Sequence, residues 1–89
     1  MMPRKLKPEE LALLREVFER RLPPERPELR ERAEENALSA VERREVCEWI
    51  ASELVETGLG PDREPTVRGL RLEALIDAVN RPNLKPNDN

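Results

Sequence analysis

Few side chains of this chain could carry acid–base, nucleophilic or metal chemistry near neutral pH. The sequence holds no histidine and no tyrosine, and Cys47 is its single cysteine. Because histidine titrates near neutral pH and is the commonest metal ligand, its absence excludes histidine-based triads, histidine-bound zinc and histidine general bases. The remaining polar residues are mainly glutamate and arginine. This composition favours a binding or assembly role over catalysis, and it predicts no cofactor.

Cys47 is the candidate nucleophile, and it lies within the apolar stripe of a predicted helix. A reactive thiolate needs a neighbouring cation or a helix N-terminus, and Arg43 and Arg44 lie about one turn away. No histidine is present to act as its base. We therefore interpret Cys47 as a small buried hydrophobic residue rather than a catalytic thiol.

Glu73, Asp77 and Asn80 recur at helical spacing, i, i+4 and i+7, towards the end of the chain. Their oxygen atoms suit magnesium or calcium, and Asp62 and Glu64 in the preceding connector could add to them. The dense spacing of a calcium-binding loop is missing, however. We predict no metal site and interpret these residues as the exposed edge of the last helix.

The size and composition of the chain limit the core that it can build. Its 89 residues suffice for one helical domain, predicted to span 1–89. A domain of this size buries only about 60–65% of the surface that the unfolded chain exposes. Hydrophobic residues make up 37% of the sequence and the aromatic ones are Phe18 and Trp49 alone, so the core must be aliphatic. Self-association would bury further apolar surface.

The net charge of −3 is distributed unevenly along the chain. Both ends are basic, whereas residues 8–80 hold 11 basic and 18 acidic residues. An acidic body is not typical of nucleic-acid-binding proteins, which concentrate basic residues on one face. A single cysteine cannot form an intramolecular disulfide, no signal peptide is evident, and no apolar stretch approaches the roughly 20 residues of a membrane span. We therefore expect a cytoplasmic protein that does not enter a membrane.

The sequence predicts an all-α fold. Strand-like alternation is missing, and the abundance of Glu, Arg, Leu and Ala favours helix. Pro8 suits a helix start, three prolines within residues 23–27 interrupt the chain, and Gly58 suggests a left-handed C-cap. Ser39 and Glu42 form a capping box, and Thr66 caps the last apolar run. We expect a small bundle of three main helices, at about 8–21, 40–57 and 67–80, plus a short helix at about 27–36 after the proline-rich loop, with flexible ends at about 1–7 and 82–89.

The last predicted helix and Trp49 indicate where a partner could bind. Between Val67 and Val79 the helix is apolar around most of its circumference, which is typical of a helix that is central in its bundle or shared with a partner. Trp49 lies at the margin of the predicted core among glutamates, as an interface anchor within a polar rim would. Packing under the proline-rich loop explains Trp49 about equally well. The candidate partner-binding residues are Trp49, Val41, Glu45, Glu53, Leu72, Ile76 and Val79.

We therefore predict a small non-enzymatic helical module for protein–protein interaction, self-associating as a homodimer through the last helix and Trp49. One alternative is an acidic inhibitor or immunity-type partner of a basic toxin or nuclease, since opposite charges speed association. Another is a weak transcription-associated DNA binder that uses Arg68, Arg71 and the basic N-terminus. The connector from Gly58 to Pro65 is longer than the turn of a helix-turn-helix, which counts against DNA binding. The sequence identifies no small-molecule substrate.

Overall fold

The computed structural model describes residues 6–81, and this part of the chain is helical apart from its connections. Its helices are α1 (Pro8–Arg21), α2 (Glu28–Glu34), α3 (Ala40–Thr57) and α4 (Val67–Asn80). The all-α prediction is thus confirmed. None of these four helices combines the length and the apolar character that a membrane span requires.

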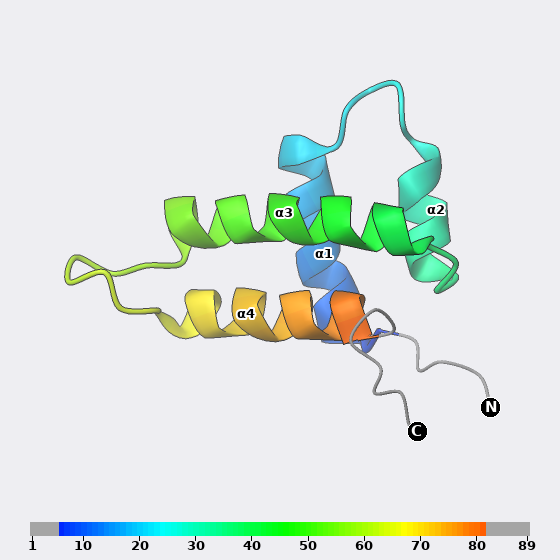
Figure 1. Cartoon of the computed structure of the whole chain (residues 1–89). Coiled ribbons are helices and arrows are strands. Elements are labelled where there is room, and N and C mark those ends of the chain that lie inside the picture. The colour runs from blue at the N-terminus through cyan, green and yellow to red at the C-terminus, as the bar shows by residue number, and fades with distance from the viewer. Residues whose placement is uncertain (1–5, 82–89) are drawn as a thin grey trace.

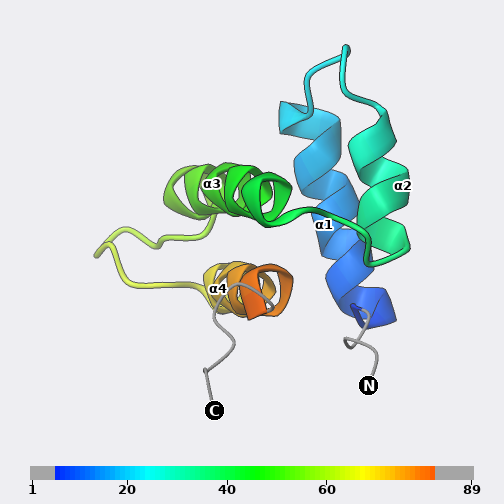
Figure 2. The same ribbon diagram turned by 45° about the vertical axis from the view of Figure 1, so that its right-hand side comes forward.

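The helices form two antiparallel pairs that pack crosswise (Figure 1). The first pair is α1 with α2, and the second is α3 with α4, which Figure 2 shows nearly end-on. Because α1 contacts both α3 and α4, it links the two pairs. The core lies where the pairs meet, and its buried apolar residues are Leu14, Val17, Phe18, Leu29, Ala33, Leu38, Val46, Ile50, Leu72, Leu75 and Val79.

Local hydrogen bonds set the starts of α3 and α4. Ser39 Oγ accepts from the Glu42 amide at 3.1 Å, and Glu42 Oε1 accepts from the Ser39 amide at 2.9 Å, so the predicted capping box is confirmed. Thr66 Oγ1 likewise accepts from the Gly69 amide at 3.1 Å. Both caps satisfy amide donors that have no partner inside the helix.

The ends of the described chain and α2 differ from the prediction in detail. Residues 1–5 and 82–89 of the predicted flexible ends lie outside the described residues. Within residues 6–81, Leu6 packs against the core, and the Lys7 amide donates to Glu10 Oε1 at 2.8 Å. The short helix α2 ends at Glu34, because the chain turns at Asn36, whose φ of 59° is left-handed and is tolerated by asparagine.

The prediction of a left-handed C-cap at Gly58 is wrong. Gly58 does follow α3, but its φ is −108°, so the backbone does not require glycine there. The glycine is needed for space, since a Cβ built at Gly58 would lie 2.8 Å from the Cα of Gly69. A Cβ built at Gly69 would lie 2.0 Å from the carbonyl oxygen of Gly58. The end of α3 and the first turn of α4 therefore touch backbone to backbone.

The connector between α3 and α4 folds back on itself like a hairpin. The Thr66 amide donates to the Gly58 carbonyl at 2.9 Å, and the Gly60 amide donates to the Glu64 carbonyl at 2.8 Å. Because the two ends of the connector are hydrogen-bonded to each other, α4 starts beside the end of α3 and runs back along it (Figure 1).

Substitution of Gly69 by alanine should destabilise the fold by at least about 2 kcal/mol, because the new methyl group would overlap the backbone of Gly58. Alanine is the better helix former, so helix propensity alone predicts a gain of about 1 kcal/mol. Urea unfolding followed by the fluorescence of Trp49 measures which effect is larger.

The matched control is Gly60→Ala, because the nearest atom to a Cβ at Gly60 is the side-chain oxygen of Asp62 at 3.4 Å. This variant should stay within about 0.5 kcal/mol of the parent chain. Equal stabilities for the Gly69 and Gly60 variants would show that the contact between the two helices does not need glycine.

Candidate interaction surface

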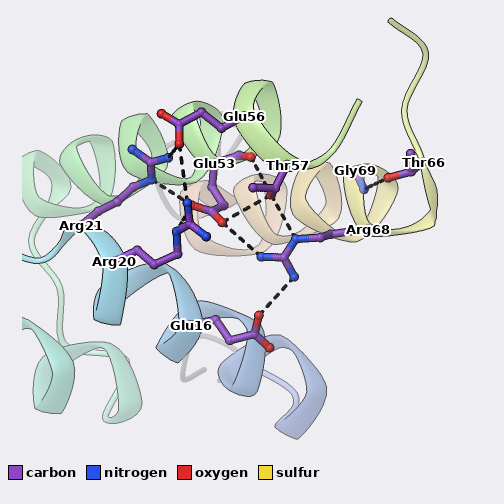
Figure 3. A network of polar contacts seen from close by, with 9 residues as sticks. All are labelled: Glu16, Arg20, Arg21, Glu53, Glu56, Thr57, Thr66, Arg68 and Gly69. Carbon is purple, nitrogen blue, oxygen red and sulfur yellow. Dashed lines mark hydrogen bonds and ion pairs between the residues drawn. The ribbon is translucent and has the colours of Figure 1, made fainter. Parts of the chain in front are cut away.

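The Glu53 carboxylate is fully buried, with 0% exposure, although the sequence placed it in an acidic rim around Trp49. Arginine side chains surround it (Figure 3). Arg21 Nε lies 3.0 Å and Arg20 Nε 3.4 Å from its Oε1, and Arg68 Nη2 lies 3.2 Å from its Oε2. This corrects the predicted position of Glu53, which is interior and not available to a partner.

The arginines keep Glu53 ionised in spite of its burial. Burial by itself would raise the pKa of Glu53, because a medium of low polarity disfavours the charged form. Hydrogen bonds from Arg21 and Arg68 and the nearby charge of Arg20 outweigh burial, so the pKa of this carboxyl is lower than its ordinary value. The folded chain therefore holds a buried negative charge that depends on its cationic partners.

The Glu53 network connects three helices. The carboxylate comes from α3, two of its arginines from the last turn of α1, and Arg68 from the first turn of α4. Arg68 also donates to Thr57 Oγ1 at 3.0 Å and to Glu16 Oε1 of α1 at 3.1 Å. These contacts fix the position at which α1 crosses the α3–α4 pair (Figure 3).

The other predicted partner-binding residues do not share one surface. Leu72 and Val79 are 0% and 1% exposed and belong to the core, which corrects their predicted place at an interface. Ile76 is half-buried, and its carbonyl accepts from the Cys47 thiol with a sulfur–oxygen distance of 3.6 Å. Val41 is 62% exposed. Two residues of the last helix that the sequence suggested for an interface are therefore buried in the core.

Trp49 is half-buried, and its contacts are internal. Its ring meets Phe18 edge-on, with ring centroids 6.4 Å apart and planes at 77°. Glu45, one turn before it, pairs with Arg26 of the proline-rich segment, with 3.0 Å between Arg26 Nη2 and Glu45 Oε1. These contacts favour the core interpretation of Trp49 over the interface interpretation, since its acidic neighbour is already engaged.

The two arginines proposed for DNA binding differ in their contacts within the fold. The Arg68 guanidinium turns into the Glu53 network, whereas Arg71 is exposed and makes no ion pair within residues 6–81. The helices α3 and α4 also lie side by side (Figure 2), unlike the crossed helices of a helix-turn-helix. Residues 1–5 of the basic N-terminus lie outside the described residues.

Cys47 lies in an environment that makes its thiol unreactive. Burial raises its pKa to about 11, and the nearby charge of Arg43 offsets this only in part. Arg43 itself is buried and donates to the Val79 carbonyl at 2.9 Å, close to the end of α4. A thiol with so high a pKa is almost wholly protonated near neutral pH, so the geometry supports the interpretation of Cys47 as a packing residue.

In the predicted stripe of Glu73, Asp77 and Asn80 along α4, the two acids are exposed as predicted, whereas Asn80 is half-buried. Asn80 Oδ1 is buried and has no hydrogen-bond partner among the described residues. Between residues 6 and 81, no three carboxylate or cysteine side chains gather as metal ligands would.

A groove of about 680 Å³ lies between the first half of α1 and α4. We call it the α1–α4 groove, and sequence reasoning missed it because it depends on how α1 crosses α4. Its lining residues are Lys7, Glu9, Glu10, Ala12, Leu13, Glu16, Val67, Arg68, Arg71 and Ala74.

One edge of the groove continues into an exposed apolar face of α4. Val67, Leu70 and Ala74 follow one another at i, i+3 and i+7, so they lie on one side of the helix. Val67 is 71% and Leu70 56% exposed, and Ala74 is also exposed. We call these three residues the outer stripe of α4. The broad apolar arc in the sequence signalled such a face, but it did not tell which side of the helix would remain outside.

The walls of the groove carry opposite charges. Glu9 and Glu10 lie in the first turn of α1, where acids favour the positive end of the helix dipole. Arg71 lies on the opposite wall, from α4. Neither Glu9 nor Arg71 forms an ion pair with another side chain of residues 6–81.

Comparison of the chain with family models, with curated proteins and with solved structures gave no match.

Replacing Glu53 by glutamine should destabilise the chain by about 2–4 kcal/mol, because three arginines lose the buried negative charge that they contact. Glu56→Gln is the matched control, since Glu56 pairs with two of the same arginines but is 55% exposed. That variant should lose less than about 1 kcal/mol. Urea unfolding measures the free energy of unfolding of both variants. Equal losses of stability would mean that the burial of Glu53 does not increase its contribution.

Stability should fall in acid partly through Glu53. Because the pKa of Glu53 is lower in the folded chain than its ordinary value of 4.5, its contribution is complete above that value. The contribution is lost as the pH falls through the lowered, folded-state pKa. The same holds for Glu42, whose pKa is lowered by its hydrogen bond from the Ser39 backbone.

Urea unfolding between about pH 7 and about pH 3 tests this dependence. The Glu53→Gln variant should lose less stability across this range than the parent chain does. Parallel acid profiles for the two proteins would exclude Glu53 as a source of the acid sensitivity.

Proposed function

We propose that this chain is a non-enzymatic helical module that binds another polypeptide through the outer stripe of α4 and the α1–α4 groove. The observation that carries the proposal is the exposure of Val67 and Leu70, which leaves two aliphatic side chains outside on adjacent turns of α4. Exposed apolar patches next to a groove with charged walls are typical of protein-binding surfaces. The groove supplies the concave part of such a surface and the outer stripe supplies the apolar part.

The state of the reactive groups supports binding rather than catalysis. The Cys47 thiol has a pKa of about 11, and the buried Glu53 carboxylate is fully engaged by arginines. Neither group is poised to accept or donate a proton near neutral pH. A cytoplasmic location forms part of the same proposal, because one cysteine without an intramolecular partner suits a reducing compartment.

The charges of the groove favour a partner of mixed charge. Its lining includes three cationic and three acidic side chains, namely Lys7, Arg68, Arg71, Glu9, Glu10 and Glu16. A uniformly basic partner would meet repulsion from one wall, and a nucleic acid would meet it from the other. The groove therefore favours a mixed protein surface over the basic toxin and the DNA considered above.

Photocrosslinking tests the proposal in the cells that make the chain. A benzophenone amino acid replaces Leu70, and irradiation should give a discrete crosslinked species of higher mass. The matched control places the same group at Val55, which is 68% exposed on α3 and lies outside the groove lining.

The crosslinked partner is identified by mass spectrometry, and both another protein and a second copy of the chain agree with the proposal. A crosslink that forms from Val55 as strongly as from Leu70 would overturn it, as would the lack of any adduct at Leu70.

A further inference from the structure

The α1–α4 groove also indicates what its partner is. We propose that a second copy of this chain binds there, so that the outer stripes of two α4 helices pack together across a two-fold axis. The inference rests on the proposed function and names the partner of the same surface.

The first argument is charge. One wall of the groove presents the carboxylate of Glu9 and the other presents the guanidinium of Arg71, and neither forms an ion pair with another side chain of residues 6–81. A surface with both signs is complementary to a copy of itself. In a two-fold interface every contact occurs twice, so Arg71 of one copy can meet Glu9 of the partner copy, and the reverse contact forms as well. Each copy thereby supplies both members of the ion pair.

The second argument is the shape and chemistry of the stripe. Val67 and Leu70 are aliphatic and more than half exposed, and Ala74 in the next turn is small. Helices pack closely where small residues meet larger ones, because ridges of one helix then fit into grooves of the other. Two such stripes would bury the largest exposed apolar groups of α4 without requiring an aromatic anchor.

The third argument is the size of the chain. A domain of 89 residues has a limited core, and Val67 and Leu70 of α4 stay outside it at 71% and 56% exposure. Within residues 6–81 no helix covers the outer stripe, since Val67 and Leu70 are more than half exposed. A second copy covers it and adds apolar burial to both chains.

Sedimentation velocity of the full chain, from about 1 to about 500 micromolar, tests the inference. The parent chain should shift from the 10.3 kDa monomer towards twice that mass as concentration rises. Arg71→Glu and Glu9→Arg should each weaken self-association at least about tenfold, because each places like charges opposite one another. Circular dichroism of both variants should match the parent, since neither residue makes an internal ion pair in the described chain.

Mixing the Arg71→Glu chain with the Glu9→Arg chain gives the sharpest result. In a mixed dimer, the carboxylate introduced at position 71 of one chain faces the guanidinium introduced at position 9 of the other. The unchanged Glu9 of the first chain and the unchanged Arg71 of the second face each other as well. The mixture should therefore dimerise about as well as the parent, although each variant alone does not. Dimerisation is restored in the mixture only if position 71 of each chain faces position 9 of the other.

Three outcomes would overturn the inference: a parent chain that is monomeric throughout, variants that dimerise unchanged, or a mixture that fails to recover. A monomeric parent whose Leu70 crosslinks to a different protein would overturn the self-pairing alone and leave the proposed function standing. A monomeric parent without any crosslink at Leu70 would overturn both.

Discussion

A buried carboxylate stays charged only while its cationic partners stay in place, and in this chain Glu53 takes those partners from two other helices. Two arginines reach it from the end of α1, and Arg68 reaches it from the start of α4. The cost of leaving such a charge unpaired is large compared with the few kcal/mol expected for a domain of this size. The crossing of α1 over the α3–α4 pair is therefore fixed by electrostatics as well as by packing.

A second constraint acts at the first turn of α4. The backbones of Gly58 and Gly69 touch, and the connector between them is closed by the hydrogen bond from Thr66 to Gly58. With its first turn held against α3 at one side and Arg68 bound to Glu53 and Glu16 at another, α4 cannot rotate about its axis. This rotation decides which residues face the core, and it leaves the outer stripe exposed beside the α1–α4 groove.

The positions of the helices could be predicted from local sequence signals, whereas the faces that they expose could not. The capping box at Ser39 and the cap at Thr66 are contacts between residues three apart, so the chemistry needed to predict them lies within one turn. Glutamate is rarely buried, so the sequence predicts an exposed Glu53, but its burial depends on arginines 15, 32 and 33 positions away in the sequence. Burial of Leu72 and Val79 likewise depends on residues distant in the sequence. The surface that we propose for a partner is therefore the outer stripe and not these two residues.

The sequence by itself determined the all-α class, the helix starts and the scarcity of catalytic groups, because these depend on composition and on neighbours within one or two turns. The role of Gly58 could not be predicted locally: its position after a helix suggested a left-handed cap, whereas in the tertiary structure it lets two backbones touch. Only the tertiary structure decided which side of the apolar helix α4 became core and which became surface. A helix that is apolar on nearly every side carries no local instruction about its orientation, so contacts with distant residues must supply it.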